Sequence, residues 1–274
     1  MSTHPPSPAP ESAAPTERAR CLNCEAPLGG PFCARCGQAD RPAAEPLGDW
    51  IRHLFQDIFS LDSRLLQTLR LLLFAPGEAT RRYVRGQRQP QTPPLRLYIG
   101  VSAVAIALMS VTGLVEFDGL FRDLSPQQVD EIVGAFGVED FRDPAFRATF
   151  DRRFNLVFPL LNLLTPLGLV LSLKLVIPRT LAQVHGVAAL HLSSTMVLIG
   201  IPPLLLSYVS QALVWLSIAV AVVLLAFATW RTLARLHPAR TGLMFFRWVA
   251  VMFTYFVLGN AISLATMAVV FLSV

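Results

Sequence analysis

Long apolar segments alternate with short polar segments over most of the chain. A segment of about twenty apolar residues is long enough to cross the hydrocarbon core of a bilayer as a helix. Backbone polar groups in lipid must be satisfied within the segment, which also favours helices. The pattern therefore predicts an all-α integral membrane protein, with a membrane domain over residues 97–274 and about five transmembrane helices. These spans are expected at about residues 97–115, 154–173, 187–208, 211–230 and 248–272.

Residues 46–96 show a different pattern, in which apolar residues recur at helical spacing among charged ones. This pattern predicts two amphipathic helices. Asp62 or Ser63 can cap the second, and Pro76-Gly77 ends it. The second helix is too short to span and contains Arg70, so it either lies in the bilayer interface or packs on the membrane domain as ordinary core. The apolar positions are Trp50, Ile51, Leu54, Phe55 and Ile58 in the first helix, and Leu65, Leu66, Leu69, Leu72 and Leu73 in the second.

A basic stretch directly precedes the first predicted span. Positive residues beside a span resist translocation, so this stretch predicts a cytoplasmic location for the N-terminal side. The same side chains could also attract anionic lipid headgroups at roughly 1 kcal/mol per charge. Two later basic loops then also fall on the cytoplasmic side, and the C-terminus falls outside. The residues proposed for lipid or partner contact are Arg81, Arg82, Arg85, Arg88 and Arg96.

The segment between the first two spans, residues 116–153, is polar and carries a net charge of −4, from nine acids and five arginines. Its acidity predicts an extracytoplasmic loop, in contrast to the basic stretch before the first span. Within it, Ser125 and Pro126 begin a pattern typical of a capped short helix. We expect this loop to be a small lid or a structural connector.

Composition supports the membrane class: 53% of residues are hydrophobic and 15% are charged. The sequence pI of about 9.4 could suggest nucleic acid, but nearly all the basic residues are Arg, which with abundant Ala and Pro indicates a GC-rich codon bias. No nucleic-acid partner is expected. Residues 1–20 are rich in Pro, Ser and Ala and lack an apolar run, so they predict a disordered leader and contain no secretory signal.

All four cysteines of the chain lie in residues 21–40, as two Cys-x-x-Cys pairs separated by eight residues. Four thiolates at this spacing can close a tetrahedron around zinc, and a closed four-Cys site is structural, without an open position for chemistry. A disulfide pair is the rival interpretation, which the predicted cytoplasmic location disfavours. The sequence predicts a zinc ribbon with Zn²⁺ bound by Cys21, Cys24, Cys33 and Cys36.

The predicted spans contain no Asp or Glu, which excludes carboxylate-based intramembrane proteolysis and proton coupling and predicts that the chain is not an enzyme. Lys174 and His191 are interpreted as interfacial anchors. In the second span, Asn155, Asn162 and the neighbouring Thr165 fall near one helical face together with two prolines. This face predicts either helix packing or a polar cavity between the second and third spans, and Pro202-Pro203 is expected to bend or break the third span.

The segments "CLNCEAPLGGPFCARCGQ", "LDSRLLQTLRLLLFAPG", "RRYVRGQR" and "PPLRLY" resemble an uncharacterised bacterial family of multi-span membrane proteins with an N-terminal four-Cys zinc ribbon, a domain of unknown function. The resemblance covers roughly residues 21–100 and implies a bacterial inner membrane, without implying an activity. Arg82 stands where the family has an acid, and Gln91 where it has an aromatic residue. The matching positions are the four cysteines, Asp62, Thr68, Leu69, Pro76, Gly77, Tyr83, Gly86, Arg88, Pro94 and Tyr98.

Two functions of different class fit these features. The first is a non-enzymatic membrane adaptor or assembly protein, whose cytoplasmic ribbon and basic helices recruit an unknown protein partner to the bilayer. The second is a small transporter or lipid-handling protein that uses the polar cavity. The closed zinc site and the absence of intramembrane carboxylates favour the adaptor. Five unequal spans without a visible repeat disfavour the common inverted-repeat transporters.

Overall fold

A computed structural model describes residues 20–41, 46–49, 64–112, 117–121, 124–137, 141–206 and 209–273. The predicted leader and the first predicted amphipathic helix, around Trp50 to Ile58, lie outside these residues. The regular secondary structure of the described part is helical, apart from two isolated β-bridges near the N-terminus. Its helices are α2 (Leu65–Phe74), α3 (Glu78–Val84), α4 (Pro94–Thr112), α5 (Phe117–Leu120), α6 (Pro126–Gly134), α7 (Pro144–Asn162), α8 (Thr165–Val176), α9 (Ala182–Leu206), α10 (Gln211–Leu236) and α11 (Thr241–Ser273).

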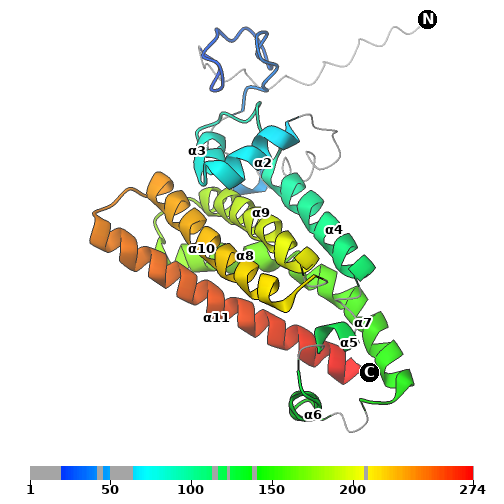
Figure 1. Cartoon of the computed structure of the whole chain (residues 1–274). Helices are drawn as coiled ribbons and strands as arrows, with labels where there is room; N and C mark the ends of the chain where they lie inside the picture. The colour runs from blue at the N-terminus through cyan, green and yellow to red at the C-terminus, as the bar shows by residue number, and fades with distance from the viewer. Residues whose placement is uncertain are drawn as a thin grey trace, which may run out of the picture.

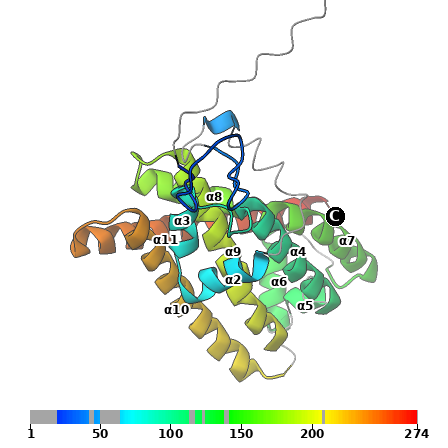
Figure 2. The same cartoon turned by 90° about the horizontal axis from the view of Figure 1, so that it is seen from above.

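In the part of the chain that the structure describes, four helices are long and apolar enough to cross a membrane: α4, α9, α10 and α11. Helix α9 lies at the centre of the bundle, in contact with α4, α8 and α10, and α11 packs along α7 and α8 (Figures 1 and 2). Most of the large exposed side chains on α10 and α11 are apolar, as expected for surfaces that face lipid. The predicted all-α membrane fold is confirmed.

The sequence predicted one continuous span at 154–173, but the structure has two helices over this range. Helix α7 ends at Asn162, and α8 begins at Thr165 after a turn at 163–164. Pro166 explains the break, since proline lacks an N–H and its ring clashes with the carbonyl four residues earlier. The α7–α8 pair still runs antiparallel to α11, from the Phe150–Phe271 contact to Gly168 beside Ile262. Neither α7 nor α8 is among the helices of the described part that are long and apolar enough to cross a membrane, so a single spanning helix at 154–173 is not found.

Helix α9 remains continuous to Leu206, although Pro202 and Pro203 lie inside it. Each proline removes one backbone hydrogen bond, but the helix continues past both of them for three residues before it ends. The expected break of the third span is therefore absent. The other spans begin earlier or end later than predicted by up to seven residues, since apolar runs do not reveal the polar turns that extend α10 and α11 beyond them.

The bundle has two different ends. One end of the bundle carries residues 20–41, α2, α3 and the connections after α8 and α10, and we call it the ribbon end (Figure 1). Helices α5 and α6 and the C-terminus lie at the opposite end. Arg235, at the end of α10, donates to the backbone oxygens of Ala75 and Pro76 and so fixes α10 to the ribbon end.

The opposite end has its own aromatic core. Phe117, Phe141, Phe150 and Phe154 are buried there and pack with Phe271 of α11. The predicted short helix is confirmed as α6, with a capping box between Ser125 and Gln128 and Pro126 in its first turn. The last ten residues of the predicted loop belong to helix α7. Most of the acidic segment that the structure describes is thus a folded cap.

Candidate metal centre and its attachment to the membrane domain

The cysteine ribbon (residues 20–41) is built from two turns with the same hydrogen bonds. In the first, Glu25 N–H donates to Cys21 O and Cys21 N–H donates to Ala26 O. In the second, Gly37 N–H donates to Cys33 O and Cys33 N–H to Gln38 O. This repeat places the four cysteines as two equivalent pairs.

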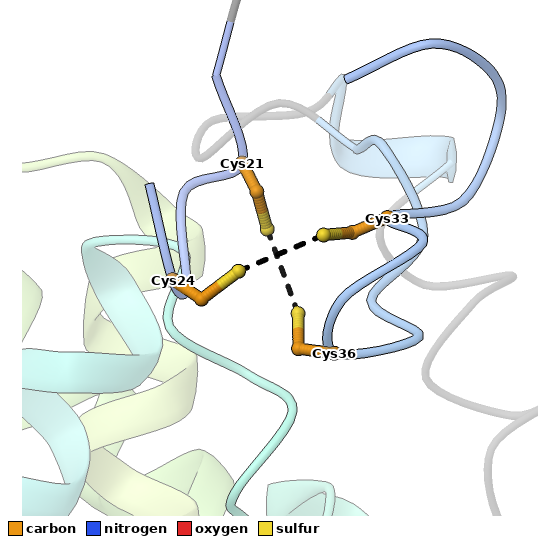
Figure 3. Close-up of side chains that lie close together, drawn as sticks. All are labelled: Cys21, Cys24, Cys33 and Cys36. Carbon is orange, nitrogen blue, oxygen red and sulfur yellow. Dashed lines mark hydrogen bonds between the residues drawn. The ribbon is translucent and has the colours of Figure 1, made fainter. Parts of the chain in front are cut away.

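The four side chains of the pairs converge on one point, as Figure 3 shows. The Sγ atoms of Cys21 and Cys36 are 3.7 Å apart, and those of Cys24 and Cys33 are 3.6 Å apart. All four sulfurs lie within 4.8 Å of one another, and all four cysteines are free. A tetrahedral ion with metal–sulfur distances of about 2.3 Å places its sulfurs about 3.8 Å apart. The ligand set therefore fits a tetrahedral metal ion.

Protonation of the facing pair Cys24–Cys33 is asymmetric. A backbone hydrogen bond from Cys36 lowers the pKa of the Cys33 thiol to about 7, and the N–H of Arg35 contributes in the same direction. For Cys24, a backbone hydrogen bond from Ala26 favours the thiolate, but burial and the other sulfurs outweigh it and raise the pKa to about 11. Zinc binds thiolates, so metal binding at this cluster releases the remaining thiol protons.

The two turns require the same left-handed backbone at the residue after the second cysteine. Gly37 has φ of +73°, which costs glycine little. Glu25 adopts φ of +59° at the equivalent position. Glutamate in place of glycine therefore does not change the turn, because Glu25 adopts the same left-handed backbone conformation.

Gln38 attaches the ribbon to the membrane domain. Its Nε2 donates to Gly86 O at 2.7 Å, and its Oε1 accepts from the N–H groups of Arg88 and Gln89, both at 3.1 Å. Leu22 packs on the same turn, where a Cβ on Gly86 would lie 2.6 Å from Leu22 Cδ1. Gly86 also has φ of +89°. Two features therefore favour glycine at this position, the left-handed backbone and the close approach of Leu22. The ribbon is therefore docked on the turn between α3 and α4.

Replacing Gln38 with alanine should release the ribbon from the turn without removing its ligands. Three hydrogen bonds are lost, one of them buried and two partly buried, which we expect to cost about 1–3 kcal/mol of docking free energy. Hydrogen exchange should accelerate at the amides of residues 86–89, while the bound metal per chain stays unchanged. Gln127→Ala, at an exposed position of α6, is the control. Unchanged protection of residues 86–89 in Gln38→Ala would contradict the docking.

Helix α3 connects the docked ribbon to the bundle through contacts with α10 and α9. The turn before it fits closely against α10, where a Cβ on Gly77 would lie 2.6 Å from the Thr232 Cα. On its other side, Thr80 Oγ1 hydrogen-bonds His191 Nδ1 of α9 at 3.0 Å, and Tyr83 meets the same imidazole edge to face. His191 is fully buried, so it is a packing residue between α3 and α9 and the prediction of an interfacial anchor was wrong.

Glu78 collects three arginines at the ribbon end. Arg81 donates to both carboxylate oxygens, Arg82 donates to Oε1 at 2.7 Å, and Arg235 Nη1 lies 3.8 Å from Oε2. The hydrogen bonds from Arg81 hold the pKa of the Glu78 carboxyl at about 2, so it stays ionised at neutral pH. Arg81 and Arg82, predicted to contact lipid or a partner, thus form an ion cluster with Glu78.

The other predicted contact arginines are not part of that cluster. Arg85 is exposed, Arg88 lies over the Tyr83 ring at 5.3 Å from its centroid, and Arg96 lines a groove on α4. The predicted basic patch is therefore divided among separate surroundings. Lys174 donates to Pro178 O and Thr180 O at the end of α8, as expected for a side chain that reaches past its helix.

The residues of the predicted polar face of the second span also lie in separate surroundings. Asn155 is exposed and donates to Asp151 O of its own helix. Thr165 begins α8 and faces the Tyr98 hydroxyl of α4, and the side chain of Asn162 lies outside the described part. A cavity between α8, α9, α10 and α11, lined mostly by apolar side chains, has about 20 Å³, enough for about one water. Asn155 and Thr165 do not line it.

Residues 62–106 match a family described as Protein of unknown function (DUF3667). The chain shares with that family the segment that joins the ribbon to the bundle, from α2 through α3 into α4. No curated protein and no solved structure matches the chain. The resemblance stated over residues 21–100 is supported over its second half, and the cysteine cluster lies outside the match. The match names no activity.

Sequence reasoning missed Gln38 and Glu78, the two residues that assemble the ribbon end. Glu78 could have been noticed as the one acid next to an Arg-rich stretch. Gln38 carries no such signal, because its function depends on contacts with residues about fifty positions later. Nothing local distinguishes it from an exposed glutamine.

Proposed function

We propose that this chain is a non-enzymatic membrane adaptor or assembly protein that holds a zinc-loaded ribbon at one face of a bilayer to recruit a protein partner. The observation that carries the proposal is the docking of the ribbon through Gln38. A ribbon fixed to the bundle presents its outer loop in one orientation, which lowers the entropic cost of binding a partner at the membrane.

The outer loop has the chemistry of a protein contact. Phe32 is 63% exposed, and its loop, residues 25–32, contains one acid and no base. Aromatic side chains are typical anchors of protein interfaces. A nucleic-acid surface would need basic residues, so the loop favours a protein partner. The four-thiolate set supports Zn²⁺ as a structural ion, since it leaves no ligand position for substrate.

We further propose a bacterial inner membrane with a cytoplasmic ribbon end. This orientation is supported by the basic residues at the ribbon end, because basic residues accumulate on the cytoplasmic side. They are the three arginines around Glu78, which include Arg235, and the exposed Arg231 and Arg240. Acidic side chains such as Asp130 and Asp143 mark the opposite end. With this orientation the N-terminus is cytoplasmic and Val274 extracytoplasmic. A transporter is not favoured, because Asn155 and Thr165 line neither of the cavities described for this chain.

The loop makes the adaptor testable by a single substitution. Phe32→Ser should reduce partner binding by about 2 kcal/mol or more, roughly thirtyfold, if Phe32 is an interface anchor. The measurement is crosslinking in intact membranes followed by affinity capture, with metal content determined on the same samples. The expected result is a specific crosslinked protein that is lost in Phe32→Ser although the zinc is retained.

Leu47→Ser is the matched control, since Leu47 is also an exposed apolar residue but lies outside the ribbon. The same crosslinked protein should persist in this variant. Complementation of a deletion strain at matched membrane levels supplies the second readout. Full complementation by Phe32→Ser, or by a chain whose four cysteines are replaced, would contradict the adaptor.

A further inference from the structure

A groove between α2, α4 and α9 lies apart from the metal centre. It has a volume of about 460 Å³, within the range of about 300–1,000 Å³ typical of small-ligand sites. Leu65 and Leu69 of α2, Gly100 and Val104 of α4 and Ile201 of α9 are among its apolar walls. Gly100 and Val104 are exposed, so the groove opens on the side of the bundle that faces lipid. Apolar walls that open sideways fit an acyl chain.

Two polar side chains line the same groove. Thr92 precedes α4, is only 2% exposed, and its Oγ1 has no hydrogen-bond partner among the residues that the structure describes. Its backbone N–H donates to Thr68 Oγ1 at 2.8 Å, which fixes its position. Arg96 lies in the first turn of α4, where the helix dipole adds positive potential. A buried hydroxyl that lacks a partner and a guanidinium at a helix start together favour an anionic oxygen ligand.

We propose that this groove is a phospholipid site, in which Arg96 and Thr92 bind the phosphate and the groove holds one acyl chain. The positive charge of Arg96 favours an anionic group, and the apolar walls favour a hydrocarbon chain. A glycerophospholipid carries both groups in one molecule. The α2 surface supports this assignment, because Leu66 and Phe74 of this helix are largely exposed, as in a helix at the bilayer interface.

The test uses the full-length protein, delipidated in detergent and titrated with dipalmitoylphosphatidylglycerol or with dipalmitoylglycerol, which lacks the phosphate. Bound lipid is counted by native mass spectrometry. Arg96→Gln should weaken phosphatidylglycerol binding about fivefold while dipalmitoylglycerol binding stays unchanged. Gly100→Leu should weaken both lipids by about tenfold or more, because its side chain would fill the groove. Arg96→Lys should retain most of the affinity for phosphatidylglycerol.

Arg70→Gln and Gly259→Leu are the matched controls. Arg70 is an exposed arginine of α2 that does not line the groove, and Gly259 on α11 has open space around it. Equal weakening in the controls, unchanged binding in Arg96→Gln, or equal affinity for both lipids in the parent protein would overturn the proposal. A dimer of the parent protein that Gly100→Leu dissociates would also overturn it, by showing a second copy in the groove.

Discussion

Serine in place of Cys33 is expected to empty the metal centre and to unfold the cysteine ribbon. Three thiolates would remain, and a serine hydroxyl is a poor ligand at neutral pH. Structural zinc contributes an apparent free energy of about 10–16 kcal/mol in small zinc domains, so this is the largest effect expected in the protein. Metal analysis of the purified chain should fall from about one zinc per chain to well below one, and amide exchange in residues 20–41 should become rapid.

The helices should survive this change, because they are buried against one another and not against the sulfurs. Far-ultraviolet circular dichroism should therefore stay close to that of the parent. Asn23→Ser is the control, since the Asn23 contact with Cys21 Sγ is made by its backbone N–H and not by its side chain. Full zinc retention by Cys33→Ser, iron in place of zinc, or a cysteine–cysteine crosslink in the parent protein would each refute the assignment.

Alanine in place of Gly77 should separate α3 from α10. The added Cβ would lie 2.6 Å from the backbone Cα of Thr232, and a backbone atom cannot swing away as a side chain can. Strain at φ of +80° adds about 1 kcal/mol and the overlap about 1–3 kcal/mol, so we expect a loss of about 2–4 kcal/mol. Denaturant unfolding in a mild detergent measures this loss, with protease sensitivity between α2 and α4 as a second readout.

Gly137→Ala isolates the contribution of the overlap. Gly137 has φ of +78°, almost the same as Gly77, but a Cβ there meets nothing within 4 Å. We expect about 1 kcal/mol of destabilisation from backbone strain alone. Equal effects of the two substitutions would show that the contact between the Gly77 turn and α10 contributes nothing to stability.

Features that depend on residues close together in the sequence could be predicted from the sequence. The apolar runs determined four continuous spans, because hydrocarbon leaves a helix as the only way to satisfy the backbone of a single segment. The spacing of the cysteines determined the cluster, and Ser125 followed by Pro126 determined the start of α6. The end of α7 before Pro166 was also encoded locally, although hydropathy alone concealed it.

By itself, then, the sequence determined the helical membrane class and the set of four thiol ligands, because both follow from composition and short spacings. The tertiary structure alone decided the rest. It docked Gln38 on a turn fifty residues away, joined Glu78 to Arg235, buried His191 against Thr80 and brought Leu65 and Ile201 to one groove. Each of these depends on which helix faces are adjacent, and hydrophobic patterns in lipid carry little of that information, since apolar side chains face both lipid and protein.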